Sequence, residues 1–205
     1  MLSSYKYIIA LALLFLALAG GGYYFYIYPP EVLKRQTQKS LDEFAQVIAT
    51  KDRAKISDYL KNLLTEQSKI KLEVTFYAMM QKNSPVISQD FEKSSFISFI
   101  DNTLYSLNDY YFNASLEEFN LNIDRKSADI TFSATAWGDG ISYFGGTSVN
   151  SRTSADSHCQ AHVVFNNKQT TLDMLDCKVE LVSVPKSGEE DKLRNNPEAL
   201  KELMR

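Results

Sequence analysis

Cysteine and histidine are scarce in this chain, and recognisable catalytic motifs are absent. Among its 205 residues are two cysteines, two histidines and one tryptophan. It contains neither a glycine-rich phosphate loop nor a serine–histidine–aspartate arrangement. The net charge of −3 offers no basic surface of the kind that nucleic acid requires. The sequence therefore predicts no catalytic, cofactor-binding or metal-binding residue and no nucleic-acid partner.

Charge is also missing from one long N-terminal stretch. Residues 7–28, "YIIALALLFLALAGGGYYFYIY", carry no charged side chain. At about 1.5 Å per helical residue this segment reaches roughly 33 Å, enough to cross a hydrocarbon core of about 30 Å. Tyrosines stand near both of its ends, as they do at membrane interfaces. We expect a single transmembrane helix over 7–28, after a short cytoplasmic tail over 1–6.

A cleavable signal peptide is the alternative interpretation of the same stretch. Ala17-Leu18-Ala19 resembles a small-residue cleavage site after an apolar region. Cleavage after Ala19 would leave "GGGYYFYIYPP" as a strongly apolar new N-terminus, which favours the uncleaved anchor.

The rest of the chain has the composition of one globular domain with a core, since 44% of all residues are apolar and 23% are charged. Apolar residues at helical spacing predict a helix from Pro30 to about Ile48, and a second one after the N-cap candidate Asp52. "KIKLEVTFY" alternates as a half-buried strand does. A third helix is expected over 90–110.

Beyond that helix the apolar period changes from helical spacing to two. Residues 117–137 predict a hairpin that turns at "DRKS", and "WGDG" predicts a sharp turn in which Asp139 is a turn residue. "TSVNSRTSADS", residues 147–157, is expected to be a polar loop. Two last strands follow, and the charged segment 185–205 is expected to be a loose tail that ends in a short helix, which needs a partner to be stable. The exported α+β domain would then cover 30–184.

Both cysteines and both histidines lie within "HCQAHVVFNNKQTTLDMLDC". If 158–166 and 170–184 form a hairpin that turns at "NNKQ", Cys159 faces Cys177 and Val163 faces Asp173. Directly opposed residues in an antiparallel pair come as close as a disulfide requires. A disulfide that closes 17 intervening residues would stabilise the domain by about 3 kcal/mol.

Zinc is the competing explanation, and it requires four converging ligands. Strand neighbours at odd separation point to opposite faces, so Cys159 diverges from both His158 and His162. The histidines are therefore expected to be exposed polar residues. The spacing favours a Cys159–Cys177 disulfide, with two reduced thiols as the alternative. A disulfide indicates an oxidising compartment, so we expect the domain in the periplasm and the anchor in the inner membrane.

The order of elements resembles the nuclear transport factor 2-like superfamily, in which a curved sheet wraps a long helix to form a cone. The likeness rests on "SLDEFAQVIATKDRAKISDYL", "DFEKSSFISFIDNTL", "FNLNIDRKSADITFSATAWGDG" and "HCQAHVVFNNKQTTLDMLDCKVELVSV". The predicted fold class is α+β: a transmembrane helix, then three helices on a curved, mostly antiparallel sheet.

That superfamily includes small-molecule isomerases and dehydratases as well as many binding domains. One of these, an inner-membrane subunit of type IV secretion systems, has one span and a periplasmic cone. The resemblance and the anchor together favour a non-catalytic binding or assembly domain with protein partners in the cell envelope, of unknown oligomeric state. The alternatives are a carrier of a hydrophobic ligand or lipid in the cone, and an isomerase-like or dehydratase-like enzyme. Candidate pocket residues are Asp173, Trp137, Tyr110, Tyr111 and Phe112.

Overall fold

The computed structural model describes residues 29–77, 86–144, 147–166 and 169–196. The chain divides into two compact units, 1–36 and 37–205. Within the described residues no helix is both long and apolar enough to cross a membrane. The transmembrane helix predicted over 7–28 lies outside the described residues, so the anchor stays a prediction.

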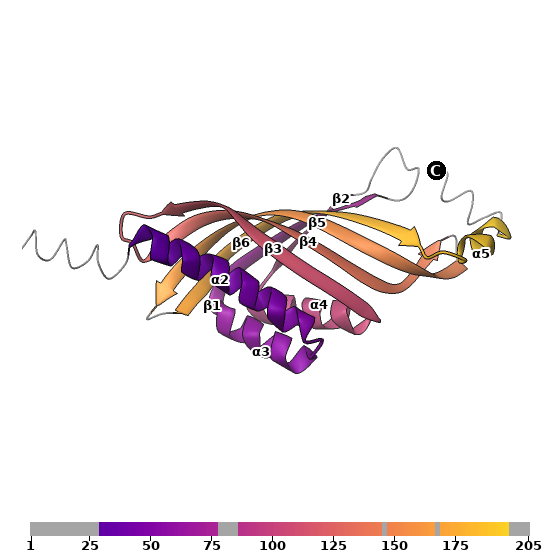
Figure 1. The fold of residues 1–205 in the computed structure, drawn as a ribbon, viewed down its shortest axis with the longest axis horizontal. Helices are drawn as coiled ribbons and strands as arrows, with labels where there is room; N and C mark the ends of the chain where they lie inside the picture. Colours follow the sequence, from indigo (N-terminus) through magenta and orange to yellow (C-terminus); the bar gives the residue numbers. More distant parts are fainter. Residues whose placement is uncertain (1–28, 78–85, 145–146, 167–168, 197–205) are drawn as a thin grey trace, which may run out of the picture. The chain divides into compact units, whose positions relative to one another are not determined.

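Four helices are described (Figure 1). Helix α2 spans Pro30–Ala49, and its part from Thr37 onward belongs to the second unit. Helix α3 spans Arg53–Leu63 and begins as predicted, because the Asp52 side chain accepts hydrogen bonds from the backbone N–H groups of Ala54 and Lys55. Helices α4 and α5 span Lys93–Tyr105 and Glu190–Arg194.

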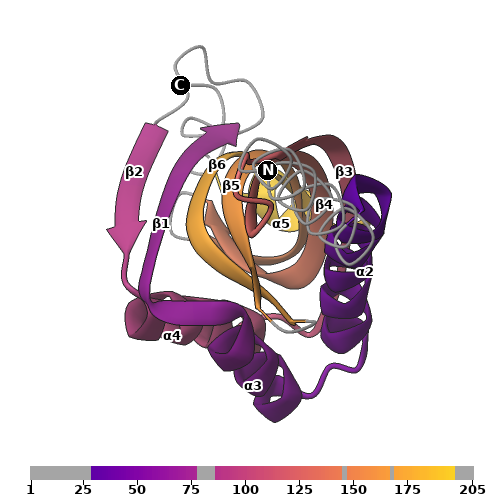
Figure 2. The same cartoon turned by 90° about the vertical axis from the view of Figure 1, so that its left-hand side faces the viewer.

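Six strands of the described part of the chain form one sheet in the order β2-β1-β6-β5-β4-β3. The strands are β1 (Leu64–Tyr77), β2 (Val86–Phe91), β3 (Asp109–Leu121), β4 (Ser127–Phe144), β5 (Thr147–Asn166) and β6 (Gln169–Pro185). Every neighbouring pair is antiparallel except β1 and β6, which run parallel. Figure 2 shows the long strands curling strongly, with α3 and α4 lying across one side. The predicted α+β class with a curved, mostly antiparallel sheet is confirmed.

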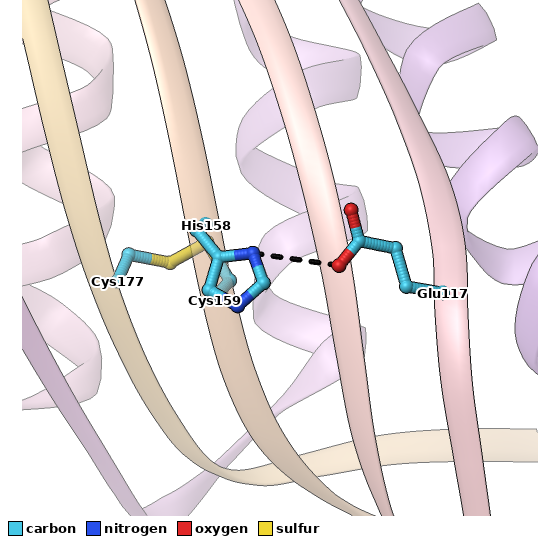
Figure 3. Close-up of a disulfide and its surroundings, with 4 residues drawn as sticks. All are labelled: Glu117, His158, Cys159 and Cys177. Carbon is cyan, nitrogen blue, oxygen red and sulfur yellow. Dashed lines mark ion pairs between the residues drawn. A yellow bond between two sulfur atoms is a disulfide. The ribbon is translucent and has the colours of Figure 1, made fainter.

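The disulfide is present, and it joins Cys159 on β5 to Cys177 on β6 with a Cα–Cα distance of 4.1 Å. The two residues are direct cross-strand partners, as the spacing predicted. Figure 3 shows this bond between neighbouring strands, with the ring of His158 directed at Glu117. Since both cysteines are buried, the bond belongs to the inner, apolar face of the sheet.

The predicted pairing fails at the turn end of the same hairpin. The structure pairs His162 with Met174 but Val163 with Leu172, so Asp173 is an extra residue on β6. A bulge of this kind shifts the register by one residue and turns the next side chain over. Leu172 is thereby buried instead of Asp173, and the expectation that Val163 faces Asp173 is wrong.

The sharp turn predicted at "WGDG" is also wrong, because residues 137–140 continue strand β4 between β3 and β5. The glycines there make room for the end of α4. A Cβ atom at Gly138 would lie 2.6 Å from Leu107 Cδ1, and one at Gly140 would lie 3.2 Å from the Ser106 carbonyl oxygen. The third helix is shorter than predicted, because the chain already begins strand β3 at Asp109 and pairs there with β4.

The polar loop predicted over 147–157 is instead the first half of β5. Its residues alternate in burial, with Val149 and Ser151 each 1% exposed. Hydroxyl groups occupy several of the inner positions, and Thr153 Oγ1 donates to Ser183 Oγ at 3.1 Å. The buried face of a strand can therefore include small polar residues, which hydropathy does not reveal.

The described part of the C-terminal segment is not loose. The backbone N–H of Lys186 donates to the Asn150 carbonyl oxygen at 2.9 Å, and the Glu189 carboxylate accepts from the Asn150 backbone N–H at 3.1 Å. Leu193 on α5 is only 4% exposed. Residues 186–196 thus pack on the end of β5, unlike the loose tail we expected.

Candidate functional site

A cavity of about 240 Å³ lies between the helices and the inner face of the sheet. Its roof is apolar and comes from three helices, with Leu41 and Phe44 on α2, Leu60 on α3, and Phe96 and Ile100 on α4. The helices present these side chains at intervals of three or four residues, the spacing of one helical face.

The floor of the cavity is made by cross-strand rows of the sheet. Because alternate residues of a strand share a face, the register places the inward residues of neighbouring strands side by side. Two of the rows that line the cavity are Phe132–Cys159–Cys177–Leu72 and Ala134–Ser157–Val179. The disulfide is therefore part of the cavity wall.

Aromatic contacts hold α2 at its place over the sheet. The ring of Phe44 stacks on Tyr59 of α3 with centroids 5.6 Å apart, and it meets Phe112 of β3 edge-on at 5.1 Å. The Tyr59 hydroxyl donates to the Ser40 carbonyl oxygen at 2.7 Å. Burial raises the pKa of Tyr59 to about 12, so this hydroxyl keeps its proton and the contact persists at any physiological pH.

The chemical character of the lining is unusually uniform. The described residues that line the cavity are apolar except for four hydroxyl-bearing ones, Thr37, Ser40, Ser157 and Thr170. None of these lining residues carries a carboxyl, imidazole, amino or guanidinium group. The site can exclude water and surround an apolar molecule, and within the lining only hydroxyl groups can form hydrogen bonds.

Of the five side chains predicted to line a pocket, Phe112 lines the cavity and the other four lie elsewhere. Asp173 is at the bulge of β6, and Trp137 and Tyr111 are cross-strand partners on the outer face, stacked with centroids 6.2 Å apart. Tyr110 pairs with Gly138 and is half-buried, and burial raises its pKa. None of the four is among the described residues around the cavity.

The two histidines lie on the outer face of β5, opposite in direction to Cys159. His158 Nδ1 is 3.4 Å from Glu117 Oε2 (Figure 3), and His162 Nδ1 is 2.8 Å from Asp129 Oδ1. In the part of the chain that the structure describes, three or more His, Cys, Asp or Glu side chains nowhere gather as metal ligands would. A metal cannot be placed on this constellation.

Asp139, predicted as a turn residue, is the centre of a charged cluster on the outer face. It is 5% exposed, and it accepts hydrogen bonds from Arg152 Nε at 2.8 Å, Arg152 Nη2 at 3.0 Å and Lys186 Nζ at 2.8 Å. The Arg152 guanidinium also lies 4.1 Å from the centre of the Trp137 ring. These hydrogen bonds, that of Arg152 first, hold the pKa of the Asp139 carboxyl well below its usual range.

The sequence identified many cavity residues only as core. The helical stripe that contains Thr37, Leu41 and Phe44 and the inward alternation of Phe132 and Ala134 were recognisable, and each predicts burial. A void between elements leaves no periodic signal, because its wall residues are the same apolar types that fill a core.

Comparison with known proteins connects the chain to one fold. The sequence matches no protein-family model. No curated protein sequence matches it either. Its structure is similar to that of a candidate scytalone dehydratase from Novosphingobium aromaticivorans DSM 12444, with a TM-score of 0.51 and 7% identity over 72% of this chain and 84% of that one.

Two further structures resemble it at lower scores. LinA aligns with a TM-score of 0.49 and 9% identity over 78% of this chain and 93% of its own. The hexachlorocyclohexane dehydrochlorinase LinA-type3 from Novosphingobium barchaimii LL02 aligns with a TM-score of 0.46 and 9% identity over 78% and 94%. The domain has the nuclear transport factor 2-like fold, as its element order predicted, and identities this low define the fold alone.

The Asp139 cluster gives a prediction about pH. An unfolded aspartate has a pKa of about 3.9, and the folded value is lower, so the stabilisation is complete above about pH 4 and disappears as the pH falls toward the folded-state pKa. Asp139→Asn should lower the free energy of unfolding at pH 7, and the difference from wild type should shrink in acid. Urea unfolding of both proteins between pH 7 and pH 2 measures this difference.

Asp156→Asn is the matched control, because Asp156 is an exposed carboxylate on β5 without an ion pair among the described residues. It should have little effect at any pH. A wild-type-to-Asp139→Asn difference that stays constant down to pH 2 would show that the cluster does not stabilise the fold through the ionised carboxylate.

Proposed function

We propose that the domain binds a small, largely apolar molecule in the cavity between its helices and sheet. The proposal rests on one observation: the cavity has an open volume, and its wall is almost entirely apolar. Of the functions that the sequence allowed, this one corresponds to the carrier of a hydrophobic ligand.

The volume of the cavity limits the size of the ligand that it can hold. An apolar cavity of about 150 Å³ stays dry and accepts benzene, so a volume of about 240 Å³ suits a molecule of roughly ten carbon atoms. Such a molecule would gain dispersion contacts with the apolar wall. A membrane lipid with its full acyl chains is too large for the volume described.

Catalysis on the ligand is the second candidate, and the fold is what favours it. The structural neighbour from Novosphingobium aromaticivorans is a candidate scytalone dehydratase. A dehydratase or isomerase needs a general base within reach of the substrate. Here the described lining offers only hydroxyl groups and no carboxylate or imidazole, which supports binding over catalysis.

The place of the domain in the cell is part of the proposal. We propose that residues 7–28 anchor it in the inner membrane and that the domain lies in the periplasm. The disulfide supports an oxidising compartment, because such bonds are rare in a reducing cytosol. An envelope partner that receives or delivers the ligand would agree with a membrane anchor, and the assembly role expected from the sequence stays a prediction.

Filling the cavity tests the binding proposal. Ala134 lines the cavity and is 6% exposed, so Ala134→Leu places three extra carbon atoms inside the void. Wild type should bind indane with a Kd between about 1 µM and 1 mM, as a ligand of this size allows. We expect Ala134→Leu to weaken binding at least about tenfold while its melting temperature stays equal or rises, because the void is filled. Titration followed by methyl NMR of Leu41, Leu60 and Val179 measures both affinity and location.

Thr135→Leu is the matched control, since Thr135 is exposed on the outer face of the same strand. It should bind indane as wild type does. If Ala134→Leu folds and binds indane with unchanged affinity, the ligand does not use this cavity and the proposal is wrong.

Protease treatment of whole cells tests the location. In intact spheroplasts an added protease should degrade the domain after residue 30, while a cytoplasmic protein of the same cells stays whole. A domain that is degraded only after lysis would place it in the cytoplasm and contradict the proposal.

A further inference from the structure

One hydroxyl group of the cavity wall differs from the other three. Ser157 points inward from β5, with Ala134 of β4 and Val179 of β6 as its cross-strand partners and Cys159 two residues further along the same face. The hydroxyl is therefore set in a wall of apolar side chains and sulfur.

The Ser157 hydroxyl has no hydrogen-bond partner among the described residues, whereas Thr37, Ser40 and Thr170 each take part in further interactions within the protein. The Ser157 Oγ atom is also accessible, since it is not one of the fully buried side-chain atoms without a partner in the described residues. Ser157 as a whole is half-buried. An accessible hydroxyl that has no partner among the described residues can donate a hydrogen bond to a molecule that enters the cavity.

The donor side of this hydroxyl is the part that most needs a partner. Groups that donate a hydrogen bond are left unpaired in protein interiors less often than acceptors, which have two lone pairs. A ligand of the cavity can satisfy the Ser157 proton only with an acceptor oxygen or nitrogen.

We infer that the ligand of this cavity is a small hydrophobic molecule with one hydrogen-bond acceptor, such as a cyclic ketone, and that Ser157 donates to it. The inference rests on the proposed binding function and adds the polar group that sets the ligand's orientation. Chemical selectivity follows, because an apolar wall with one donor favours a ketone over the hydrocarbon of the same shape, and disfavours charged molecules.

A matched pair of ligands tests the inference. Indane and 1-indanone have the same ring skeleton and differ by one carbonyl oxygen. We expect Ser157→Ala to weaken binding of 1-indanone about fivefold, the effect of one net hydrogen bond, and to leave indane within about twofold of wild type. The affinity ratio of the two ligands is the quantity measured, since it cancels changes in cavity shape.

Two more variants separate a ligand contact from a structural role. Ser157→Thr keeps the hydroxyl and should keep the wild-type ratio, even if its methyl group weakens both ligands. Ser154→Ala makes the same chemical change on the outer face of β5, where Ser154 is exposed, and should change neither ligand. Without ligand, Ser157→Ala should melt no lower than wild type, because a hydroxyl without a partner in the protein contributes no internal hydrogen bond.

The outcomes are distinguishable. If wild type binds both ligands and Ser157→Ala leaves their ratio unchanged, the inference about the acceptor is wrong while cavity binding stands. If wild type binds neither ligand, the proposed function fails and this inference fails with it. A marked loss of stability in ligand-free Ser157→Ala would show a structural hydroxyl and also overturn the inference.

Discussion

The cross-link between Cys159 and Cys177 fixes which residues of the two central strands face the helices. A slip of one residue between β5 and β6 would turn one strand's whole apolar set to the outer face. The covalent bond excludes that slip for the central part of the pair. It also places the disulfide itself, and Ser157 beside it, in the floor of the cavity. The candidate site therefore depends on one pairing that the sequence specifies chemically.

The roof over this floor is held by contacts at its edges. Phe44 packs between Tyr59 and Phe112, and Arg53 of α3 donates two hydrogen bonds to Asp101 of α4 at 2.8 and 2.6 Å. With the helices tied to each other and to β3, they do not collapse into the space between themselves and the curved sheet. An empty apolar cavity lowers stability in relation to its volume, and a bound ligand restores it by linkage. This is the physical reason to interpret the void as a site.

Prediction from the sequence succeeded where local pattern and structure coincide. Asp52 was recognised as a helix cap because capping is local, and the Cys159–Cys177 pair because alternation fixes the faces of a hairpin. It failed for β2, whose first five residues are all exposed and so show no alternation, and for 147–157, where hydroxyl-bearing residues hold several of the inward positions. The prediction for Asp173 was wrong because a bulge shifts the register there, and a bulge leaves no signal in the spacing of apolar residues. The cavity could not be predicted because it depends on the space left between helices and strands that are far apart in the sequence.

The proposed binding function requires an accessible apolar void between the helices and the disulfide-linked strands. The most direct measurement is a crystal structure under xenon pressure, because xenon enters dry apolar cavities without any requirement for hydrogen bonds. We expect xenon between Phe132, Cys159 and Ile100, with no backbone shift of the sheet. A structure in which side chains fill this space and xenon is found only elsewhere would contradict it.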